Sequence, residues 1–369
     1  MERISVIDEN WELLKNFFPD KWRDLAKKTG ANTRLRGFDS VDNLMRTLLL
    51  HIAKGYSLRE TVVRAKASQI ANISDVALLK RLRKSEEWLS ELCIRLLKET
   101  NLVIPTFPKQ SNIRLVDATI VKEPGKTGSQ WRIHYSFTIP KFKCDFFELT
   151  PVKGIGTGET FTRIPLSEND HIIGDRGYST VNGIEYIQQN KAFSLVRVNT
   201  AALNIYKNDG KVFDLLKTLT ELKSELQTGE WEVVLHGKVE KIEGRICAIK
   251  KSNTSAELTI KKLKREANKK GHKIKPATLE YAKYVILFTT FSKEKYKAAE
   301  ILEIYRFRWQ IELMFKRLKS LVQLGHLPKY DQESSKAWLY GKLFVGLLTE
   351  KVIQTAETKS PWGYDLKKK

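Results

Sequence analysis

The sequence predicts an α/β protein in which a helical N-terminal domain precedes a mixed sheet that carries a β-rich insertion. Residues 1–105 have the apolar spacing of helices. Segments rich in β-branched and aromatic residues follow, and strands then alternate with helices, a pattern typical of a mixed α/β sheet. Two prolines in the segment 104–110 mark the boundary between the two parts.

The N-terminal part is expected to consist of short helices joined by tight turns. Gly55 breaks the helical pattern, and Ser57 and Ser74 or Asp75 are suitable N-caps. The basic run KRLRK at 80–84 would lie on the last of these helices, as in a helix-turn-helix-like DNA reader. A small helical bundle of another kind would show the same pattern, so both interpretations stay open.

The second part, residues 106–350, is expected to form the sheet. The segments that predict strands are 112–121, 130–139, 145–152, 170–174, 192–199 and 284–290, and those that predict helices are 181–190, 305–319 and 334–354. Residues 351–369 are expected to form a basic C-terminal tail.

Residues 200–283 interrupt the alternation of strands and helices and are interpreted as an insertion. Strand-like segments occur at 231–242 and 245–252. The polybasic run 259–275 follows them, and Lys261 and Lys262 lie in it. A block of like charge is usually a solvated or disordered arm, and it can also follow the phosphates of a nucleic acid.

The charge of the chain favours a polyanionic partner. Lys and Arg number 65 against 43 Asp and Glu, which gives a net charge of +22. Nucleic acid is the commonest partner of so basic a protein. A membrane is not expected, because no apolar run approaches the roughly 18 residues that a spanning helix needs. The three cysteines have no metal-like spacing and are typical of a reducing cytoplasm.

Common nucleotide and zinc motifs are absent from the sequence. The triplet GKT at 125–127 lacks the first glycine of a phosphate-binding loop, because Ile120 stands at that position. The segment KGIGTGETF at 153–161 is not followed by the helix start of a dinucleotide site, so a plain loop is expected there. The sequence contains no HExxH, paired CxxC or GxSxG motif.

Two acids end apolar strands and are candidate metal ligands. Asp117 ends IRLVD, and Asp175 ends IIGD between Gly174 and a second glycine at 177. An aspartate at such a place often caps only the backbone. Glycine beside it, however, lets a backbone and a ligand approach closely.

A third candidate acid lies on the predicted helix 305–319. Since a helix turns about 100° per residue, Tyr305, Arg308, Glu312 and Lys319 share one face. The bland interpretation is a solvated face held by ion pairs such as Glu312 with Lys316. Alternatively, Glu312 joins Asp117 and Asp175 around two Mg²⁺ ions, with Mn²⁺ as a possible substitute, for in-line attack at phosphorus. Tyr305, Arg308 and Lys319 would then contact phosphates beside the scissile bond.

These residues resemble the DDE transposases of bacterial insertion sequences, the IS-four family. Its signature Y-x2-R-x3-E-x6-K is similar to the spacing of Tyr305, Arg308, Glu312 and Lys319. VDAT around Asp117 and GDRGY around Asp175 resemble its first two acidic motifs. The long gap before Glu312 is similar to the family's β-rich insertion, and the resemblance covers about residues 40–350.

The resemblance implies an RNase H-like catalytic domain and a cut-and-paste DNA transposase. Such an enzyme binds terminal inverted repeats of double-stranded DNA, pairs two ends in a homodimer or larger complex, and joins the freed 3′ ends to target DNA. It implies a bacterial cytoplasmic, nucleoid-associated protein. Some relatives form a DNA hairpin with an aromatic residue that stacks on a flipped base. Tyr284 or Val285 stands at the matching place, so a hairpin step is left open.

Other residues near the motifs have weaker assignments. Arg176 and Tyr178 are expected to steady the loop at Asp175, although Tyr178 also suits a core position. Trp131, Arg132 and His134 lie on a strand next to the proposed site, and we expect His134 to be structural. Arg176 and Tyr284 are predicted to contact DNA, as are Lys261 and Lys262.

Two other functions fit the same residues. One is a metal-dependent nuclease or resolvase that cuts DNA without strand transfer. The other is a non-catalytic DNA-binding protein derived from a transposase. The presence of all three acids speaks against loss of the site, and only an assay of cleavage and joining separates the three.

Overall fold

The computed structural model describes residues 10–99, 112–122, 130–139, 143–308 and 331–359. In the N-terminal part the helices are α1 (Trp11–Lys15), α2 (Trp22–Lys28), α3 (Val41–Lys54), α4 (Leu58–Ala67), α5 (Asp75–Lys84) and α6 (Glu86–Glu99). The strands that follow are β1 (Asn112–Lys122), β2 (Gln130–Ile139), β3 (Lys143–Pro151), β4 (Asp170–Gly174) and β5 (Phe193–Arg197). Between them lie the short helices η1 (Phe161–Arg163) and η2 (Arg176–Tyr178), and α7 (Val181–Gln189).

The rest of the described chain contains the insertion and the C-terminal helices. The insertion comprises β6 (Ile205–Tyr206), α8 (Leu215–Leu219), β7 (Thr228–His236), β8 (Lys241–Lys250), α9 (Asn253–Lys269) and α10 (Pro276–Tyr281). Strand β9 (Tyr284–Thr289) follows, residues 298–308 are helical, and α12 (Gln332–Lys359) comes last. The predicted α/β class is confirmed. No helix among these residues is long and apolar enough to cross a membrane.

Local sequence signals explain most of the helix boundaries in the N-terminal part. Ser57 and Ser74 accept hydrogen bonds from backbone N–H groups in the first turns of α4 and α5, as N-caps do. Gly55 ends α3 in the left-handed conformation, with φ of 71°. The serine caps and the glycine stop predicted from the sequence are therefore confirmed.

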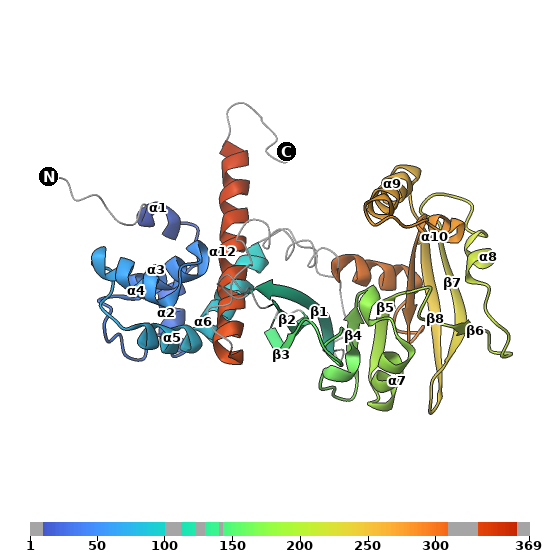
Figure 1. The fold of residues 1–369 in the computed structure, drawn as a ribbon, viewed down its shortest axis with the longest axis horizontal. Helices are drawn as coiled ribbons and strands as arrows, with labels where there is room; N and C mark the ends of the chain where they lie inside the picture. The colour runs from blue at the N-terminus through green and yellow to red at the C-terminus, as the bar shows by residue number, and fades with distance from the viewer. Residues whose placement is uncertain (1–9, 100–111, 123–129, 140–142, 309–330, 360–369) are drawn as a thin grey trace.

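Nine strands form one mixed sheet in the order β3-β2-β1-β4-β5-β9-β8-β7-β6. Only the pairs β1–β4 and β4–β5 are parallel, and every other pair is antiparallel. The insertion is thus not a separate lobe, because β8 pairs with β9 and continues the sheet of the motif-bearing strands. Figure 1 shows this hairpin of β7 and β8 at the end of the molecule opposite the N-terminal helices.

The two faces of the sheet bury two different cores. Along β1, Ile113 and Leu115 face a core shared with the N-terminal helices, α12 and the helix of residues 298–308. Val116 faces the other core, which α7 and the insertion share. Alternation of side chains along a strand produces this division. It determines which residues of β1 can meet the helix that carries Tyr305 and Arg308.

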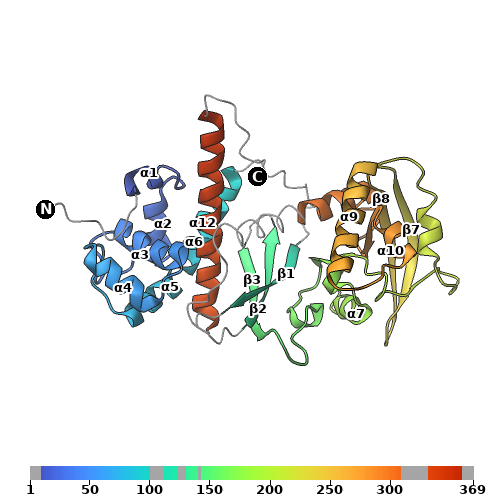
Figure 2. The same cartoon turned by 45° about the horizontal axis from the view of Figure 1, so that its top comes forward.

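The C-terminal helix α12 packs beside the N-terminal helices. It lies along α6 and also contacts α3 and α5, as both views show (Figures 1 and 2). Cys93 of α6 donates to the carbonyl of Tyr340, 3.3 Å away. The sequence predicted a basic tail at residues 351–369. Residues 351–359 instead belong to α12, which extends to Lys359.

Candidate active site

Asp117 lies in β1, just beyond the last residue that pairs with β4. The parallel register of these strands ends at Leu115 opposite Ile173. On its other side Asp117 stands opposite Tyr135 of β2, whose hydroxyl donates to Asp117 Oδ2 at 3.1 Å. Oδ1 accepts from the N–H of Ala118 at 2.8 Å. Both carboxylate oxygens are therefore oriented by the strand pair.

Asp175 follows β4 directly and caps the short helix η2. Its Oδ1 accepts from the N–H of Gly177 at 2.8 Å. If the β1–β4 register continued two residues beyond Leu115 and Ile173, Asp117 would stand opposite Asp175, and neighbouring strands lie about 4.8 Å apart. Asp175 thus lies at the carboxyl end of β4, whereas Asp117 is inside β1, which continues to Lys122 and does not end at the acid as expected. Asp117 lies close to the point where the pairing of β1 with β4 stops.

Two buried tyrosines near the acids, Tyr178 and Tyr135, have raised pKa values. Burial raises the pKa of Tyr178 most, and the charges of Asp117, Glu159 and Asp175 raise it further. Burial also raises the pKa of Tyr135, followed by the effect of Asp117. The pKa of each phenol therefore lies above its usual value, which keeps both phenols protonated and able to donate.

The helix of residues 298–308 carries Tyr305 and Arg308 side by side. Both side chains are buried, and the Arg308 guanidinium carbon lies 5.1 Å from the centre of the Tyr305 ring. The charge of Arg308 also acts to lower the pKa of Tyr135, against the larger effects of burial and Asp117. Arg308 is therefore close to the Tyr135–Asp117 pair. These two positions are not part of a solvated helix face, which was the bland interpretation.

Glu312 and Lys319 lie outside the described residues, so the predicted triad stays a prediction. Within the described part of the chain, no group of three or more His, Cys, Asp or Glu residues is arranged to hold a metal ion. Asp117 and Asp175 supply two of the oxygen ligands that a hard cation such as Mg²⁺ prefers. The residues present fit such an ion only if a further ligand joins them.

Glu159, which the sequence did not single out, lies beside Asp175. A Cβ atom placed on Gly177 would overlap Glu159 Oε2 and lie 3.1 Å from Asp175 Oδ1. The two carboxylates therefore meet over the backbone of Gly177. This approach gives a structural reason for glycine at that position in GDRGY. The only signal in the sequence was the acid within KGIGTGETF, a segment expected to be a plain loop.

Two arginines hold the loop that carries Glu159. Arg132 of β2 donates to the carbonyl of Thr157 at 2.7 Å. Arg163 donates to the carbonyl of Gly156 and pairs with Glu148 of β3 at 2.9 Å. The loop is thus fixed to β2 and β3, and it adds a further carboxylate to the end of the sheet that holds Asp175.

His134, expected to be structural, is buried in the sheet. Its side chain is 2% exposed, and Nε2 lies 2.9 Å from Thr150 Oγ1. Burial, with the charges of Arg163 and Arg132, lowers its pKa to about 4. The imidazole is therefore neutral near pH 7. His134 also stands opposite Ala118 and thus points to the face of the sheet away from Asp117.

Arg176 and Tyr284, both predicted to contact DNA, have different surroundings. Arg176 is exposed beside Asp175, and its Nη2 lies 3.4 Å from Asn199 Oδ1. Arg197 is exposed at the end of the neighbouring strand β5. Tyr284, by contrast, is 5% exposed and packs in the core shared with the insertion. In this conformation its ring packs among the side chains of that core.

The polybasic run forms a helix rather than a disordered arm. Ser252 caps α9, and the helix extends to Lys269. Lys261 and Lys262 are exposed on it. Figures 1 and 2 place α9 on the insertion, well away from the N-terminal helices.

The basic residues of α5 divide into two groups. Arg81 donates to the carbonyl of Arg34, and Arg83 pairs with Asp331 at 3.2 Å near the start of α12. Lys80 and Lys84 are exposed. The KRLRK run therefore uses its arginines within the fold and presents its two lysines to solvent.

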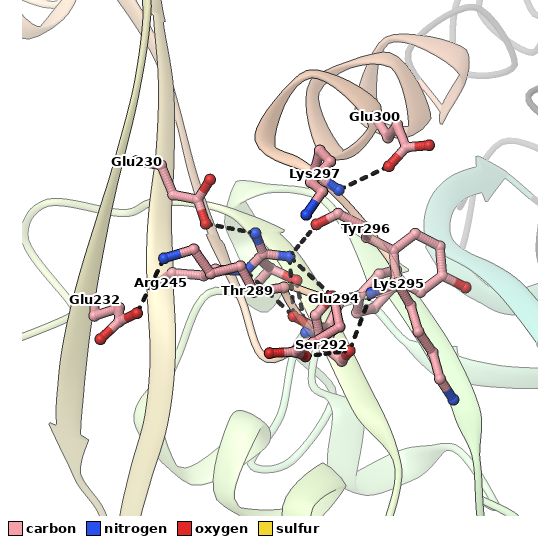
Figure 3. A network of polar contacts seen from close by, with 12 residues as sticks. Glu230, Glu232, Arg245, Thr289, Ser292, Glu294, Lys295, Tyr296, Lys297 and Glu300 are labelled. Carbon is pink, nitrogen blue, oxygen red and sulfur yellow. Dashed lines mark hydrogen bonds and ion pairs between the residues drawn. The ribbon is translucent and has the colours of Figure 1, made fainter.

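A buried arginine of the insertion fixes the turn that precedes the helix of Tyr305 and Arg308. Arg245 of β8 donates to the carbonyls of Phe291 at 3.2 Å and Tyr296 at 2.6 Å. It also pairs with Glu230 of β7 at 2.7 Å, and Figure 3 shows the guanidinium enclosed by these groups. The insertion thus determines where the helix begins.

Comparisons with known proteins show the family to which the chain belongs. A family model described as a transposase DDE domain matches residues 156–348, a span that contains Asp175 and Glu312 and begins after Asp117. The putative transposase InsL for insertion sequence element IS186A of Escherichia coli (strain K12) is 31% identical over 359 residues, which cover 95% of this chain and 96% of that protein.

Two further relatives extend the comparison. The transposase for insertion sequence element IS421 of Escherichia coli is 31% identical over 360 residues, 95% of this chain and 96% of that protein. The transposase for IS231B of Bacillus thuringiensis subsp. berliner is 24% identical over 385 residues, 92% of this chain and 79% of that protein. The family indicated by the sequence motifs is confirmed, and the chain belongs to the DDE transposases of bacterial insertion sequences.

Proposed function

We propose that this transposase cuts double-stranded DNA at the ends of its element and joins the freed 3′ ends to target DNA. Asp117, Asp175 and Glu312 would hold two Mg²⁺ ions. The observation that carries the proposal is that Asp117 of β1 and Asp175 after β4 come from adjacent parallel strands and both act on the buried Tyr178 hydroxyl. When bound, such ions activate the attacking oxygen and stabilise the leaving one.

The chain's own residues bind and orient the DNA around the scissile phosphate. Tyr135 donates to Asp117 and fixes the direction of its carboxylate. Arg308 supplies positive charge next to it, and a guanidinium can hold a phosphate through two hydrogen bonds. Lys319 would add a second cation. Arg176, exposed beside Asp175, would contact the neighbouring phosphate.

The arrangement of strands supports an RNase H-like catalytic domain. Three antiparallel strands, β3, β2 and β1, continue into the parallel strands β4 and β5. Asp117 lies on β1, which is antiparallel to β2 and parallel to β4. Asp175 lies at the carboxyl end of β4. Ligands of open α/β sheets bind at the carboxyl ends of such strands.

Two surfaces outside the site would bind the transposon end. The α4–α5 pair presents Lys80 and Lys84 as a helix-turn-helix-like reader, in keeping with residues 1–105 as a DNA-binding domain. On the insertion, Lys261 and Lys262 of α9 would contact phosphates. We further propose a homodimer in the complex that pairs two ends, and a bacterial cytoplasmic, nucleoid-associated location for this highly basic chain.

The test is strand cleavage and joining on labelled DNA that carries the element's own ends, in Mg²⁺, with parent and Glu312→Gln. Glutamine keeps the shape of glutamate and removes its charge. The parent is expected to cut and join. The variant is expected to bind the ends with unchanged affinity and to lose at least about 100-fold in cleavage rate, as loss of a major electrostatic group does.

Other outcomes would change the proposal. Cleavage by Glu312→Gln at the parent's rate would remove Glu312 from the site. A parent that cuts without joining would indicate the metal-dependent nuclease. Binding that survives a chelator, with no cleavage in Mg²⁺ or Mn²⁺, would indicate a non-catalytic DNA-binding protein.

A further inference from the structure

Thr119 is a polar residue buried in β1 whose hydroxyl has no hydrogen-bond partner among the described residues. The side chain is 3% exposed. Threonine and valine have nearly the same shape, and valine suits a buried strand at least as well. The strand therefore carries a buried hydroxyl that makes no hydrogen bond to the described residues.

The hydroxyl lies on the face of the sheet that holds Asp117. Side chains two residues apart on a strand point to the same face, about 6.6 Å from one another. Ile113, Leu115 and Val121 lie on this face of β1 and belong to the core that the helix of residues 298–308 also contacts. Thr119 stands opposite Ile133 of β2. On this stretch of β1, Thr119 and Asp117 are thus the polar residues of an otherwise apolar face.

The surroundings of Asp117 indicate what the hydroxyl would meet. Tyr135 and Ala118 already donate to the two oxygens of Asp117. Arg308 adds positive charge beside this pair. A group bound here with further negative charge, such as a phosphate, would need one more donor, and a hydroxyl can rotate to provide it.

We propose that Thr119 donates a hydrogen bond to a non-bridging oxygen of the scissile DNA phosphate when it is bound at the site of Asp117 and Asp175. The inference rests on the proposed function and adds a substrate-contacting residue to it. It explains why a buried donor without an internal partner lies two residues from an acid of the site. A hydrogen bond to a charged oxygen is stronger than one between neutral groups.

The test compares Thr119→Val and Thr119→Ser with the parent in thermal unfolding, DNA binding and single-turnover cleavage. Because the hydroxyl has no internal partner, Thr119→Val is expected to unfold at the parent's temperature or above it. Its affinity for the end DNA in a chelator should stay within about twofold, and its cleavage rate should fall about 10- to 100-fold. Thr119→Ser, which keeps the hydroxyl, should cleave within about threefold of the parent.

Thr289→Val is the matched control for a threonine whose hydroxyl the fold uses. Thr289 is fully buried in β9, donates to the carbonyl of Ser194 at 2.9 Å and accepts from the N–H of Phe291 at 3.0 Å. This variant should unfold at a clearly lower temperature than the parent. A similar loss in Thr119→Val would show a structural hydroxyl and overturn the inference.

Three other results also overturn it. One is cleavage by Thr119→Val at the parent's rate, and another is equal loss in the valine and serine variants. A higher Mg²⁺ concentration for half-maximal cleavage by Thr119→Val would assign the hydroxyl to the metal's water instead of the phosphate. If the parent protein does not cleave DNA, the proposed function is contradicted. A change of cleavage seen only in Thr119→Val concerns the role of Thr119 alone.

Discussion

Gly177 stands where the carboxylates of Glu159 and Asp175 approach each other. Its backbone N–H donates to Asp175, and the Glu159 carboxylate occupies the space that a side chain would fill. A Cβ atom there overlaps the end of the Glu159 side chain, which must move, and lies tightly against Asp175 Oδ1. The position of the Glu159 carboxylate therefore depends on glycine at 177.

Gly177→Ala is expected to reduce cleavage by at least about tenfold, because an atom at that position displaces Glu159 or Asp175 and misplaced catalytic groups lose much of their effect. Gly158→Ala is the control, since a Cβ there meets nothing within 4 Å. Single-turnover cleavage of end DNA, with circular dichroism to confirm folding, measures both. Equal activity in the two variants would contradict the assignment of Gly177.

At this scale the sequence singles out Asp117 and Asp175 as candidate ligands but does not indicate the residues that hold them. Each of the two acids follows a run of apolar residues, a pattern visible in a single segment, although Asp117 lies inside β1 and only Asp175 follows a strand. In the sequence, Tyr135 and Thr119 look like ordinary strand residues. The contact of Tyr135 with Asp117 depends on the register between β1 and β2. Such pairings join segments that are distant in the sequence, and local patterns do not encode them.

Among the elements, the turn of residues 291–296 links the insertion to the helix of Tyr305 and Arg308. Arg245 is 4% exposed and is held by Glu230 and three backbone carbonyls (Figure 3). Lys297 begins the next segment, and its N–H donates to Glu300 at 2.7 Å. The insertion thereby supports the helix that the site needs, in addition to any contact with DNA.

Arg245→Met is expected to lower the free energy of unfolding by about 3 kcal/mol, because it leaves Glu230 and the backbone carbonyls without their buried partner. Lys293→Met is the control in the same region, since Lys293 and Glu232 form an exposed pair at 3.1 Å. An exposed pair contributes about 0–1 kcal/mol. Urea unfolding of both variants is the measurement, and equal stability would contradict the role of Arg245.

The sequence predicted most elements but not all of their boundaries. The segment 231–242 was expected to be one strand-like piece, whereas β7 ends at His236 and β8 begins at Lys241. The polybasic run was expected to be a solvated or disordered arm, and Ser252 instead caps a helix there. A short turn divides the first segment, and a single capping serine starts the helix in the second. The overall composition of each segment indicates neither feature.

Across the whole molecule, distant segments combine in ways that local patterns do not show. The insertion extends the catalytic sheet through β8 and β9, and α12 packs along α6 beside the N-terminal helices (Figures 1 and 2). The DNA-binding helices proposed here and the acids of β1 and β4 therefore belong to one connected fold. The division into domains rested on prolines and composition, which do not specify such packing.

The central claim is that Asp117 and Asp175 hold divalent metal in the DNA complex. Electron paramagnetic resonance of Mn²⁺ bound to the complex tests it most directly, with the parent, Asp175→Asn and the exposed-turn control Asp209→Asn. Asparagine still accepts the bond from Gly177, so the variant is expected to fold and to bind the end DNA. The account predicts protein-bound Mn²⁺ in the parent and the control and its loss in Asp175→Asn. Equal Mn²⁺ binding by all three proteins would contradict the account.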